Sequence, residues 1–139
     1  MLIKLEIVSL EKKIFEGMIN SVILPTPLGE TGILPLHIPL VTSLVPGELR
    51  INHQDRTDYL AVSGGFAEVH PDRVLVLVDA AEHAEEIDLQ TAEEARKKAV
   101  ETMKKAGIQK EAFEEAAAEL RRSLVRLKVA RKKRKRGQF

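Results

Sequence analysis

The chain has 139 residues, of which 44% are hydrophobic and 31% are charged, and its formal net charge is +1. This length and composition predict one modest domain, or one small domain with an appendage, and exclude a chain that is disordered throughout. The absence of cysteine excludes disulfides, thiolate metal sites and cysteine nucleophiles. No apolar run approaches the roughly 20 residues of a membrane-spanning helix. The first residues alternate apolar with charged side chains, so we expect no secretory signal and, most simply, a cytosolic protein.

The near-zero total charge conceals an asymmetry between the two parts of the chain. Residues 1–87 contain six Lys or Arg and 13 Asp or Glu, a balance of −7, whereas residues 88–139 contain 16 and eight, a balance of +8. Residues 121–136 alone contain ten basic residues and no acidic one. Such polarity is typical of two segments with different partners.

The first 80 residues carry the period-2 pattern of β-strands. In residues 2–8, the apolar Ile3, Leu5 and Ile7 alternate with charged residues. Further short strands are expected at residues 19–24, 49–53, 59–62, 66–69 and 73–78. Turn residues such as Gly64-Gly65 separate them. Short strands at this spacing, with no helical period between them, predict an antiparallel sandwich or barrel.

At about residue 80 the apolar period changes from 2 to 3.6. Two helical stripes follow, one formed by Ala92, Ala95, Ala99, Met103 and Ala106 and the other by Phe113, Ala117, Leu120, Leu124 and Leu127. We therefore predict an α+β fold. An N-terminal antiparallel β-sandwich of about 8–10 short strands occupies residues 1–84, and a C-terminal antiparallel αα-hairpin with a basic tail occupies residues 85–139. The two helices are expected at about 88–106 and 110–135.

The ends of the first helix are marked by capping residues. Gly107 stands where a helix C′ residue belongs, and Lys104 and Lys105 would occupy the last turn, which favours the helix dipole. The start is open, because Asp88 is one N-cap candidate while Thr91 with Glu94 fits a capping box.

The first helix presents mostly alanine to the second, so the seam between them removes little apolar area from water. At about 25 cal/mol per Å² such a seam contributes much less than a leucine-lined one. Helix propensity is high in both segments, so each helix is expected to be more stable than its docking. The sequence is compatible both with a hairpin that opens while staying helical and with one that is statically docked.

No constellation of residues predicts an active site. The histidines at positions 37, 53, 70 and 83 match no zinc motif and are expected to be surface or structural residues. No serine lies in a Gly-x-Ser-x-Gly elbow. The Gly29–Gly32 segment lacks the ending of a phosphate loop and is expected to be a tight turn. We therefore predict no catalytic residue, no metal site and no enzymatic activity of the chain's own.

The C-terminal basic run admits three interpretations. Arg121, Arg122, Arg126 and Lys128 precede six consecutive basic residues at 131–136 and would bind polyanions readily. A nucleic-acid binder is one interpretation, although one Tyr, four Phe and no Trp provide few stacking platforms. A solvated helix end is the second, and an acidic protein surface, which suits bidentate arginine contacts, is the third.

Several stretches resemble the epsilon subunit of bacterial F-type ATP synthases, in the same order and over nearly the whole chain. The most specific is Gly29–Leu40, which fits the family pattern Gly-Ile-Leu-Pro-x-His-x-Pro-Leu. The others are Ile7–Ser9, Ile14–Gly17, Pro46–Ile51, Val62–Val69 and Val74–Glu82. The change of period at residue 80 also falls where that family passes from sandwich to hairpin.

The resemblance implies a non-catalytic central-stalk subunit that couples the c-ring and the gamma subunit to the catalytic head. The segment that the family uses near the rotor corresponds to Gly32, Ile33, Leu34, Pro35, His37 and Pro39, although for the His37 side chain a structural role in a turn remains open. The family's hairpin can lie folded on the sandwich or extend along gamma into the head, where it blocks ATP hydrolysis, and the resting position in this chain is left open. When it is extended, Arg121, Arg122, Arg126 and Lys128 are expected to meet an acidic loop of the beta subunit. Alpha is a further partner of the extended hairpin.

Some members of that family bind ATP on the folded hairpin as a regulatory ligand, and we expect this chain to require no cofactor. The associated motif is Ile/Leu-Asp-x-x-Arg-Ala, and here Thr91 replaces its arginine. Glu82, Asp88, Arg122 and Arg126 match other positions of that site, so nucleotide binding is an open expectation.

The resemblance also implies a location. A peripheral subunit on the cytoplasmic face of the bacterial inner membrane is expected, held to the membrane only through the complex. The tail Arg131–Phe139 is more basic than we expect of the family and would strengthen docking, touch anionic lipid or remain solvated. The alternative to the whole assignment is a nucleic-acid-binding β-domain with a basic helical tail, which the resemblance does not favour.

Overall fold

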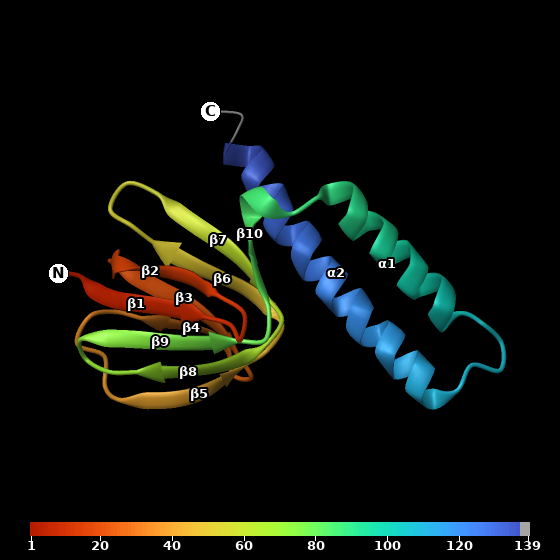
Figure 1. Cartoon of the computed structure of the whole chain (residues 1–139), viewed down its shortest axis with the longest axis horizontal. Helices are drawn as coiled ribbons and strands as arrows, with labels where there is room; N and C mark the ends of the chain where they lie inside the picture. Colours follow the sequence, from red (N-terminus) through yellow and green to blue (C-terminus); the bar gives the residue numbers. More distant parts are fainter. Residues whose placement is uncertain (137–139) are drawn as a thin grey trace. The chain divides into compact units, whose positions relative to one another are not determined.

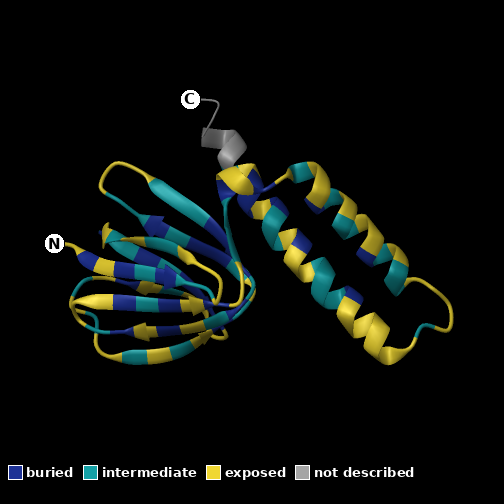
Figure 2. Ribbon diagram, in the orientation of Figure 1, coloured by how far each residue is buried: buried dark blue, intermediate teal, exposed yellow. Residues whose placement is uncertain are grey.

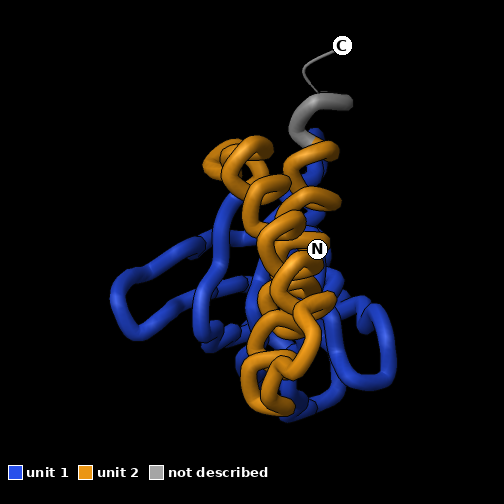
Figure 3. The backbone as a smooth tube through the Cα atoms, turned by 90° about the vertical axis from the view of Figure 1, so that its right-hand side faces the viewer, with its two compact units in different colours: residues 1–83 blue, residues 84–139 orange. Residues whose placement is uncertain are grey.

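The computed structural model describes the backbone of residues 1–136 and the side chains of residues 1–132. The chain forms two compact units, Met1–His83 and Ala84–Phe139 (Figure 3). Most of the tail whose role was left open, from residue 133 onward, therefore lies outside the described side chains.

The first unit contains ten strands in two five-stranded sheets (Figure 1). Their bounds are β1 Ile3–Val8, β2 Lys13–Ile19, β3 Ser21–Thr26, β4 Gly29–Ile33, β5 Leu40–Leu44, β6 Gly47–Asn52, β7 Thr57–Val62, β8 Gly65–Val69, β9 Arg73–Val78 and β10 Ala81–His83. The first sheet has the order β2-β1-β9-β8-β5 and the second the order β10-β7-β6-β3-β4. The predicted sandwich is confirmed.

One pairing departs from the antiparallel pattern. All neighbouring strands run antiparallel except β1 and β9, which are parallel, with Leu5 opposite Val74 and Ile7 opposite Val76. A parallel pair cannot be joined by a tight turn, and here most of the sandwich lies between its two strands. Local sequence patterns therefore did not indicate it.

The core lies between the inner faces of the two sheets (Figure 2). The alternating residues Ile3, Leu5 and Ile7 are fully buried, as the period-2 pattern predicts. The facing sheet contributes Leu49 and Ile51 from β6, which are also fully buried. Each such side chain contributes about 1.5–3 kcal/mol of transfer free energy.

The tight turn expected at Gly29–Gly32 is wrong. These residues form most of the edge strand β4, which pairs with β3, and the turn lies at Pro27-Leu28. Gly29 begins the strand with φ +109°, a conformation that glycine adopts without strain. The strand expected at 19–24 is also divided, because β2 ends at Ile19 and β3 runs from Ser21 through Pro25 to Thr26.

The second unit consists of a 3₁₀ turn η1 (Ala84–Glu86) and two α-helices, α1 (Leu89–Met103) and α2 (Lys110–Arg136). Asp88 is the N-cap of α1, and its carboxylate accepts hydrogen bonds from the backbone N–H groups of Gln90 (2.9 Å) and Thr91 (3.2 Å). The capping-box alternative at Thr91 is therefore wrong, since Thr91 already lies within the helix.

The expected C-terminus of the first helix is also corrected. The C-cap is Lys104, so α1 ends before residue 106 and the lysines at 104 and 105 follow its last turn. Gly107 has φ +73° but lies in the connecting loop and is not the C′ residue. A glycine with positive φ serves an interhelical turn as readily as a helix end, and the sequence does not separate the two.

The apolar stripe expected on the second helix is shifted in phase, since Leu127 is its only fully buried member. Phe113 and Leu124 are 41% and 48% exposed, while the buried residues that share one face of α2 are Ala116, Ser123, Leu127 and Ala130. At 3.6 residues per turn this face is rotated by roughly 70° from the predicted one. The expectation for the first helix fares better, since Ala92 and Ala99 are buried.

Replacing Gly65 by alanine is expected to destabilise the sandwich strongly. Gly65 has φ +145° in β8, and a Cβ there would overlap the carbonyl oxygen of Leu77 and lie 2.9 Å from the Cα of Val78. Both are backbone atoms of β9, so relief requires movement of a core strand. We expect Gly65→Ala to lower the free energy of unfolding in urea by about 3 kcal/mol or more.

Gly32→Ala is the matched control for this prediction. Gly32 lies in the edge strand β4 with nothing within 4 Å of a Cβ placed there and without a positive φ. We expect its free energy of unfolding to change by less than about 1 kcal/mol. Equal effects of the two substitutions would contradict the steric argument.

Candidate functional site

The segment that the sequence assigned to a rotor contact forms the end of β4 and the loop that follows it. Gly32 and Leu34 are exposed, and so is Pro39 at the far end. Pro35 and His37 are half-buried. Ile33, the remaining member of this predicted set, is fully buried in the sandwich core, so it holds the segment from inside and offers no surface to a partner.

The loop is held in a specific conformation by backbone hydrogen bonds. Leu36 has φ +66°, which costs a non-glycine residue about 1–2 kcal/mol. Its N–H donates to the carbonyl oxygen of Pro71 (2.8 Å), which offsets this strain. The result is an exposed Leu36 side chain beside exposed Leu34 and Ile38. Sequence analysis did not select Leu36 or Ile38, because a left-handed leucine has no sequence signature.

The His37 side chain has a structural contact. Its Nδ1 lies 2.6 Å from the carbonyl oxygen of Ile38. Because a carbonyl oxygen only accepts, Nδ1 carries the hydrogen, which leaves Nε2 for any other contact. The structural role in a turn that the sequence left open is therefore observed for Nδ1.

A second exposed apolar surface lies on the outer face of the first sheet. Val41 on β5 is 74% exposed, Phe66 on β8 is 61% exposed, and Leu77 on β9 stands opposite Phe66 in the strand register. With Leu75 and Glu68 these side chains line one shallow hollow. We call Val41, Phe66, Leu75 and Leu77 the apolar patch. Sequence analysis missed it, although the outward positions of these strands carry apolar residues where water-facing strands usually carry polar ones.

The other half of the same outer face is ionic. Lys13 on β2 lies 2.7 Å from Glu16 and 3.7 Å from Glu6, and Lys4 lies 3.6 Å from Glu16. The hydrogen bond to Glu16 raises the pKa of Lys13, and the same bond lowers the pKa of Glu16. These charges form ion pairs with one another. The outer face of the first sheet therefore has one half made of ion pairs and another half made of exposed apolar side chains.

The four basic residues predicted to contact an acidic partner divide between two sides of α2. Arg121 and Lys128 are exposed, and their positions place them on the same side of the helix as the exposed Phe113 and Leu124. We call Phe113, Arg121, Leu124 and Lys128 the outer stripe of α2. Arg122 and Arg126 lie on another side of the helix, roughly 130° around the helix axis from Arg121 and Lys128.

Arg122 borders a groove that runs between the two helices. Its Nη2 donates to Glu119 Oε2 over 2.6 Å, and Lys98 faces the same groove from α1. The remaining lining is mainly small or acidic, namely Ala95, Ala99, Thr102, Ala112, Glu115, Ala116 and Glu119. The groove therefore combines two cations with two carboxylates.

The predicted nucleotide-binding residues lie in both units. Glu82 belongs to β10 in the first unit, whereas Asp88, Arg122 and Arg126 belong to the second. Hydrogen bonds from the backbone of Thr91 and Gln90 hold the pKa of Asp88 below its ordinary value, and the Arg126 charge adds a smaller effect in the same direction. The Asp88 carboxylate thus already serves as a helix cap.

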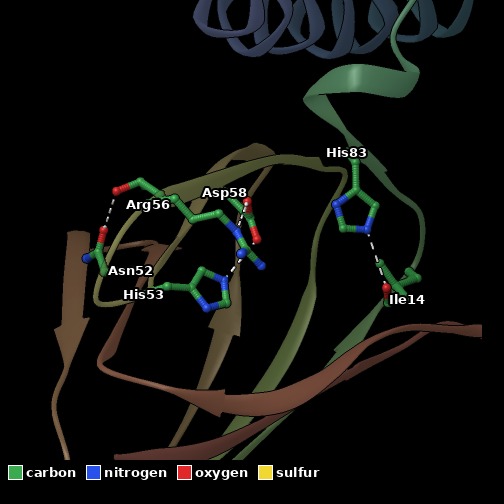
Figure 4. Close-up of polar contacts among 7 residues, drawn as sticks. Ile14, Asn52, His53, Arg56, Asp58 and His83 are labelled. Atoms are coloured by element: carbon green, nitrogen blue, oxygen red, sulfur yellow. Dashed lines mark hydrogen bonds and ion pairs between the residues drawn. The ribbon is translucent and has the colours of Figure 1, made fainter. Parts of the chain in front are cut away.

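The remaining histidines have protein partners. His53 Nε2 lies 2.9 Å from Asp58 Oδ2 at the end of the β6–β7 hairpin, and Arg56 approaches the other oxygen of Asp58 (Figure 4). His70 Nε2 lies 2.6 Å from Glu68 Oε1. Among the described residues, no three His, Asp or Glu side chains gather as metal ligands would.

No helix in the described part of the chain is both long and apolar enough to cross a membrane.

Comparison with known proteins assigns both units. Residues 2–84 match the family described as ATP synthase, Delta/Epsilon chain, beta-sandwich domain, and residues 85–131 match ATP synthase, Delta/Epsilon chain, long alpha-helix domain. The chain belongs to the ATP synthase delta/epsilon family. The resemblance drawn from the Gly29–Leu40 segment and its companions is thereby confirmed.

Relatives within this family span nearly the same length. An ATP synthase epsilon chain from Dehalococcoides mccartyi is 47% identical over 136 residues, covering 98% of this chain and 97% of the relative. One from Acidithiobacillus ferridurans is 43% identical and covers 99% and 96%. No nucleic-acid-binding family is needed to account for the basic tail, and that alternative has no support.

Solved structures share the fold of this family member. A chain in the Euglena gracilis mitochondrial ATP synthase structure of OSCP, F1 and c-ring aligns with a TM-score of 0.82 at 24% identity, covering 93% of this chain and 81% of that one. A chain of the Tetrahymena thermophila mitochondrial ATP synthase central stalk and c-ring aligns with a TM-score of 0.62 at 15% identity, covering 92% and 96%.

The cap of α1 predicts a pH dependence of the hairpin. Because the pKa of Asp88 is lowered in the folded state, its stabilising effect is complete above the unfolded value of about 3.9 and is lost as the pH falls through the lower folded value. We expect the protection factors of amides in the first turn of α1, which compare their exchange with that of the unfolded chain at the same pH, to fall at acidic pH. NMR titration of the Asp88 carboxyl carbon measures the folded pKa directly.

Two substitutions separate capping from charge. Asp88→Asn keeps an oxygen that accepts hydrogen bonds from the N–H groups of Gln90 and Thr91, so the amides of the first turn stay protected from exchange. Their protection should no longer change with pH through titration of residue 88. Asp88→Ala removes the cap at every pH. A carboxyl pKa at or above the ordinary aspartate value would contradict the assignment.

Proposed function

We propose that the chain is a non-catalytic central-stalk subunit of an F-type ATP synthase. In this role it couples the c-ring and the gamma subunit to the catalytic head, and its C-terminal helices inhibit ATP hydrolysis. The observation that carries the proposal is the family match over both units, together with relatives named ATP synthase epsilon chain that align over nearly their full length. As part of that complex the chain is a peripheral subunit at the cytoplasmic face of the bacterial inner membrane.

The gamma subunit docks on the apolar patch of the first sheet and on the loop after β4. Exposed Val41 and Phe66 support this contact, because isolated soluble domains seldom leave adjacent large apolar side chains in water without a partner. The neighbouring charged half, with Lys13 between Glu6 and Glu16, is already paired and adds little to affinity. The c-ring also contacts the Gly32–Pro39 segment, which includes the loop after β4 and which the resemblance assigns to gamma and the c-ring together.

Phe66→Ala is expected to weaken assembly without weakening the fold. The ring is mostly exposed in the isolated chain but would be buried in the complex, and aromatic residues at the centre of an interface often dominate its affinity. We expect at least a tenfold lower affinity for the gamma subunit, measured by surface plasmon resonance, with an unchanged midpoint of urea unfolding.

Leu10→Ala is the control for Phe66→Ala. Leu10 is fully exposed in the turn between β1 and β2 and is not among the residues that line the hollow of the apolar patch. We expect no change in gamma affinity. An equal loss with Leu10→Ala, or none with Phe66→Ala, would show that gamma docks elsewhere.

Inhibition of hydrolysis is carried by the outer stripe of α2. Phe113 and Leu124 leave apolar surface exposed there, and Arg121 and Lys128 stand beside them with their charges in water. A face of this composition fits an acidic surface with apolar spots, such as the loop of the beta subunit expected from the resemblance. Arg122 and Arg126 point away from this stripe, so we assign them a smaller part in the contact.

Removing charge from the outer stripe is expected to relieve inhibition. Arg121→Ala with Lys128→Ala should raise ATPase activity of the assembled enzyme severalfold, approaching the activity obtained when the chain stops after Glu86. The matched control is Arg122→Ala with Arg126→Ala, which removes the same charge from the other side of the helix and should raise activity less. Assays at two salt concentrations test the electrostatic origin.

The shortened chain decides whether the hairpin regulates at all. If an enzyme whose chain stops after Glu86 hydrolyses ATP no faster than the full-length enzyme, the hairpin is a structural element only. If the two paired variants act equally, the outer stripe is not the contact surface.

Nucleotide binding to the hairpin stays a prediction. Lys98 and Arg122 face one groove from opposite helices, which favours a polyphosphate, but Glu115 and Glu119 line the same groove and oppose it. Thr91 supplies no guanidinium, and the Asp88 carboxylate is engaged as the N-cap. Titration of the full chain with ATP in a calorimeter tests this, with heat that disappears in Arg122→Ala with Arg126→Ala as the expected result. Absence of heat at millimolar ATP would remove the ligand from the proposal.

A further inference from the structure

The boundary between the two units coincides with the end of a very short strand. β10 contains only Ala81–His83, lies at the edge of the second sheet and pairs with a single neighbour, β7. The ladder has three positions, Ala81 with Val62, Glu82 with Ala61 and His83 with Leu60. Three edge residues on one neighbour form a weak attachment by themselves, because a short ladder offers few hydrogen bonds against the entropy of ordering the chain.

The last residue of this strand makes an additional contact with the other sheet. His83 Nε2 lies 3.3 Å from the carbonyl oxygen of Ile14 in β2, 69 residues earlier in the chain (Figure 4). Because a carbonyl oxygen only accepts, Nε2 carries the hydrogen and donates it. β2 is the edge strand of the first sheet and β10 the edge strand of the second. The imidazole therefore ties together the two sheet edges at one side of the sandwich.

Beyond His83 the chain is tied to the helical unit instead. The 3₁₀ turn η1 begins at Ala84 and contacts α2, and the N–H of Ile87 donates to the carbonyl oxygen of Ala84 over 3.3 Å. Asp88 then caps α1. Among the contacts named above, those with the sandwich end at residue 83 and those with the hairpin begin at residue 84, which is also where the two compact units divide.

We infer that His83 is the anchor of the hairpin: its hydrogen bond to Ile14 fixes β10 to the sandwich, so that the hairpin pivots at the His83–Ala84 peptide and not along β10. As a statement about regulation, this rests on the proposed inhibitory role of the hairpin. The consequence is mechanical. A pivot fixed at one peptide gives the hairpin a defined starting point, whereas a β10 that peeled off β7 would lengthen its tether by about 10 Å, at roughly 3.3 Å per residue.

Hydrogen exchange on the full chain tests the anchor. In His83→Ala the amides of β10 should exchange roughly three- to tenfold faster, the effect of one lost hydrogen bond, while those of η1 change by less than about twofold. His83→Gln should restore the exchange rates of β10, because its side-chain amide nitrogen donates from a similar position. Unchanged β10 exchange in His83→Ala, or equal acceleration in β10 and η1, would overturn the inference.

A disulfide tests the pivot in the assembled enzyme. The chain has no cysteine, so Val62→Cys with Ala81→Cys, at paired positions of β7 and β10, introduces one possible bond, whose formation is checked by mass spectrometry. If the pivot lies beyond β10, oxidation should leave inhibition of ATP hydrolysis within about twofold of the reduced enzyme; Ala81→Cys alone is the control. Loss of inhibition on oxidation in the double variant only would place the pivot within β10 and overturn the inference.

The two experiments separate this inference from the proposed function. If stopping the chain after Glu86 leaves hydrolysis unchanged, the regulatory role fails, yet the exchange rates of His83→Ala and His83→Gln still decide whether His83 anchors β10 and whether motion divides at residue 84. If shortening relieves inhibition but the exchange pattern fails, the hairpin regulates and the anchor is elsewhere.

Discussion

The parallel pairing of β1 with β9 holds the first sheet together. Without it the sheet would separate into a β2-β1 ribbon and a three-stranded β9-β8-β5 piece. The pair brings Leu5 next to Val74, which lies nearly 70 residues later in the chain. Closing so long a loop costs conformational entropy, and this cost is offset only when the inward-facing residues of both strands are buried in the shared core. The charged half and the apolar patch meet along this pair. The candidate docking surface therefore depends on a contact between the beginning and the end of the sandwich.

Strands were predicted correctly from sequence where one face of the strand is apolar and the other charged. They were missed at the edges of the sheets, where a strand does not need this alternation of apolar and charged residues. β1 and β9 have clean alternation and were found. Two of the missed strands, β4 and β10, lie at sheet edges, where glycines or half-buried polar residues are tolerated. The Gly29–Leu40 segment identified the family, but its glycines gave the wrong local structure for Gly29–Gly32. A resemblance rests on the order of residues in the whole segment, whereas the turn was expected from the glycines alone.

In the hairpin, sequence analysis found the helices but misplaced the face of α2 that is buried. The apolar spacing selected Phe113 and Leu124 together with Leu127, whereas the buried face combines Leu127 with Ala116 and Ser123. Small side chains let two helices approach closely, so at an alanine-lined seam size and burial are poorly related. The polar Ser123 is accommodated because its hydroxyl donates to the carbonyl oxygen of Glu119. The same holds for the basic site residues of α2. The resemblance identified these residues, but it did not show which side of the helix each one occupies.

The corrected phase changes how the basic residues of α2 relate to one another. The resemblance assigned Arg122 and Arg126 both to an acidic partner and to a nucleotide. In the structure Arg121 and Lys128 lie on the outer stripe, while Arg122 borders the groove and Arg126 influences the carboxyl of Asp88 near the start of α1. Because the two pairs point roughly 130° apart, a partner on the stripe and a ligand in the groove do not need the same side chains. Any antagonism between them must then act through the position of the hairpin, since each ligand can alter the other only by favouring one arrangement of the helices.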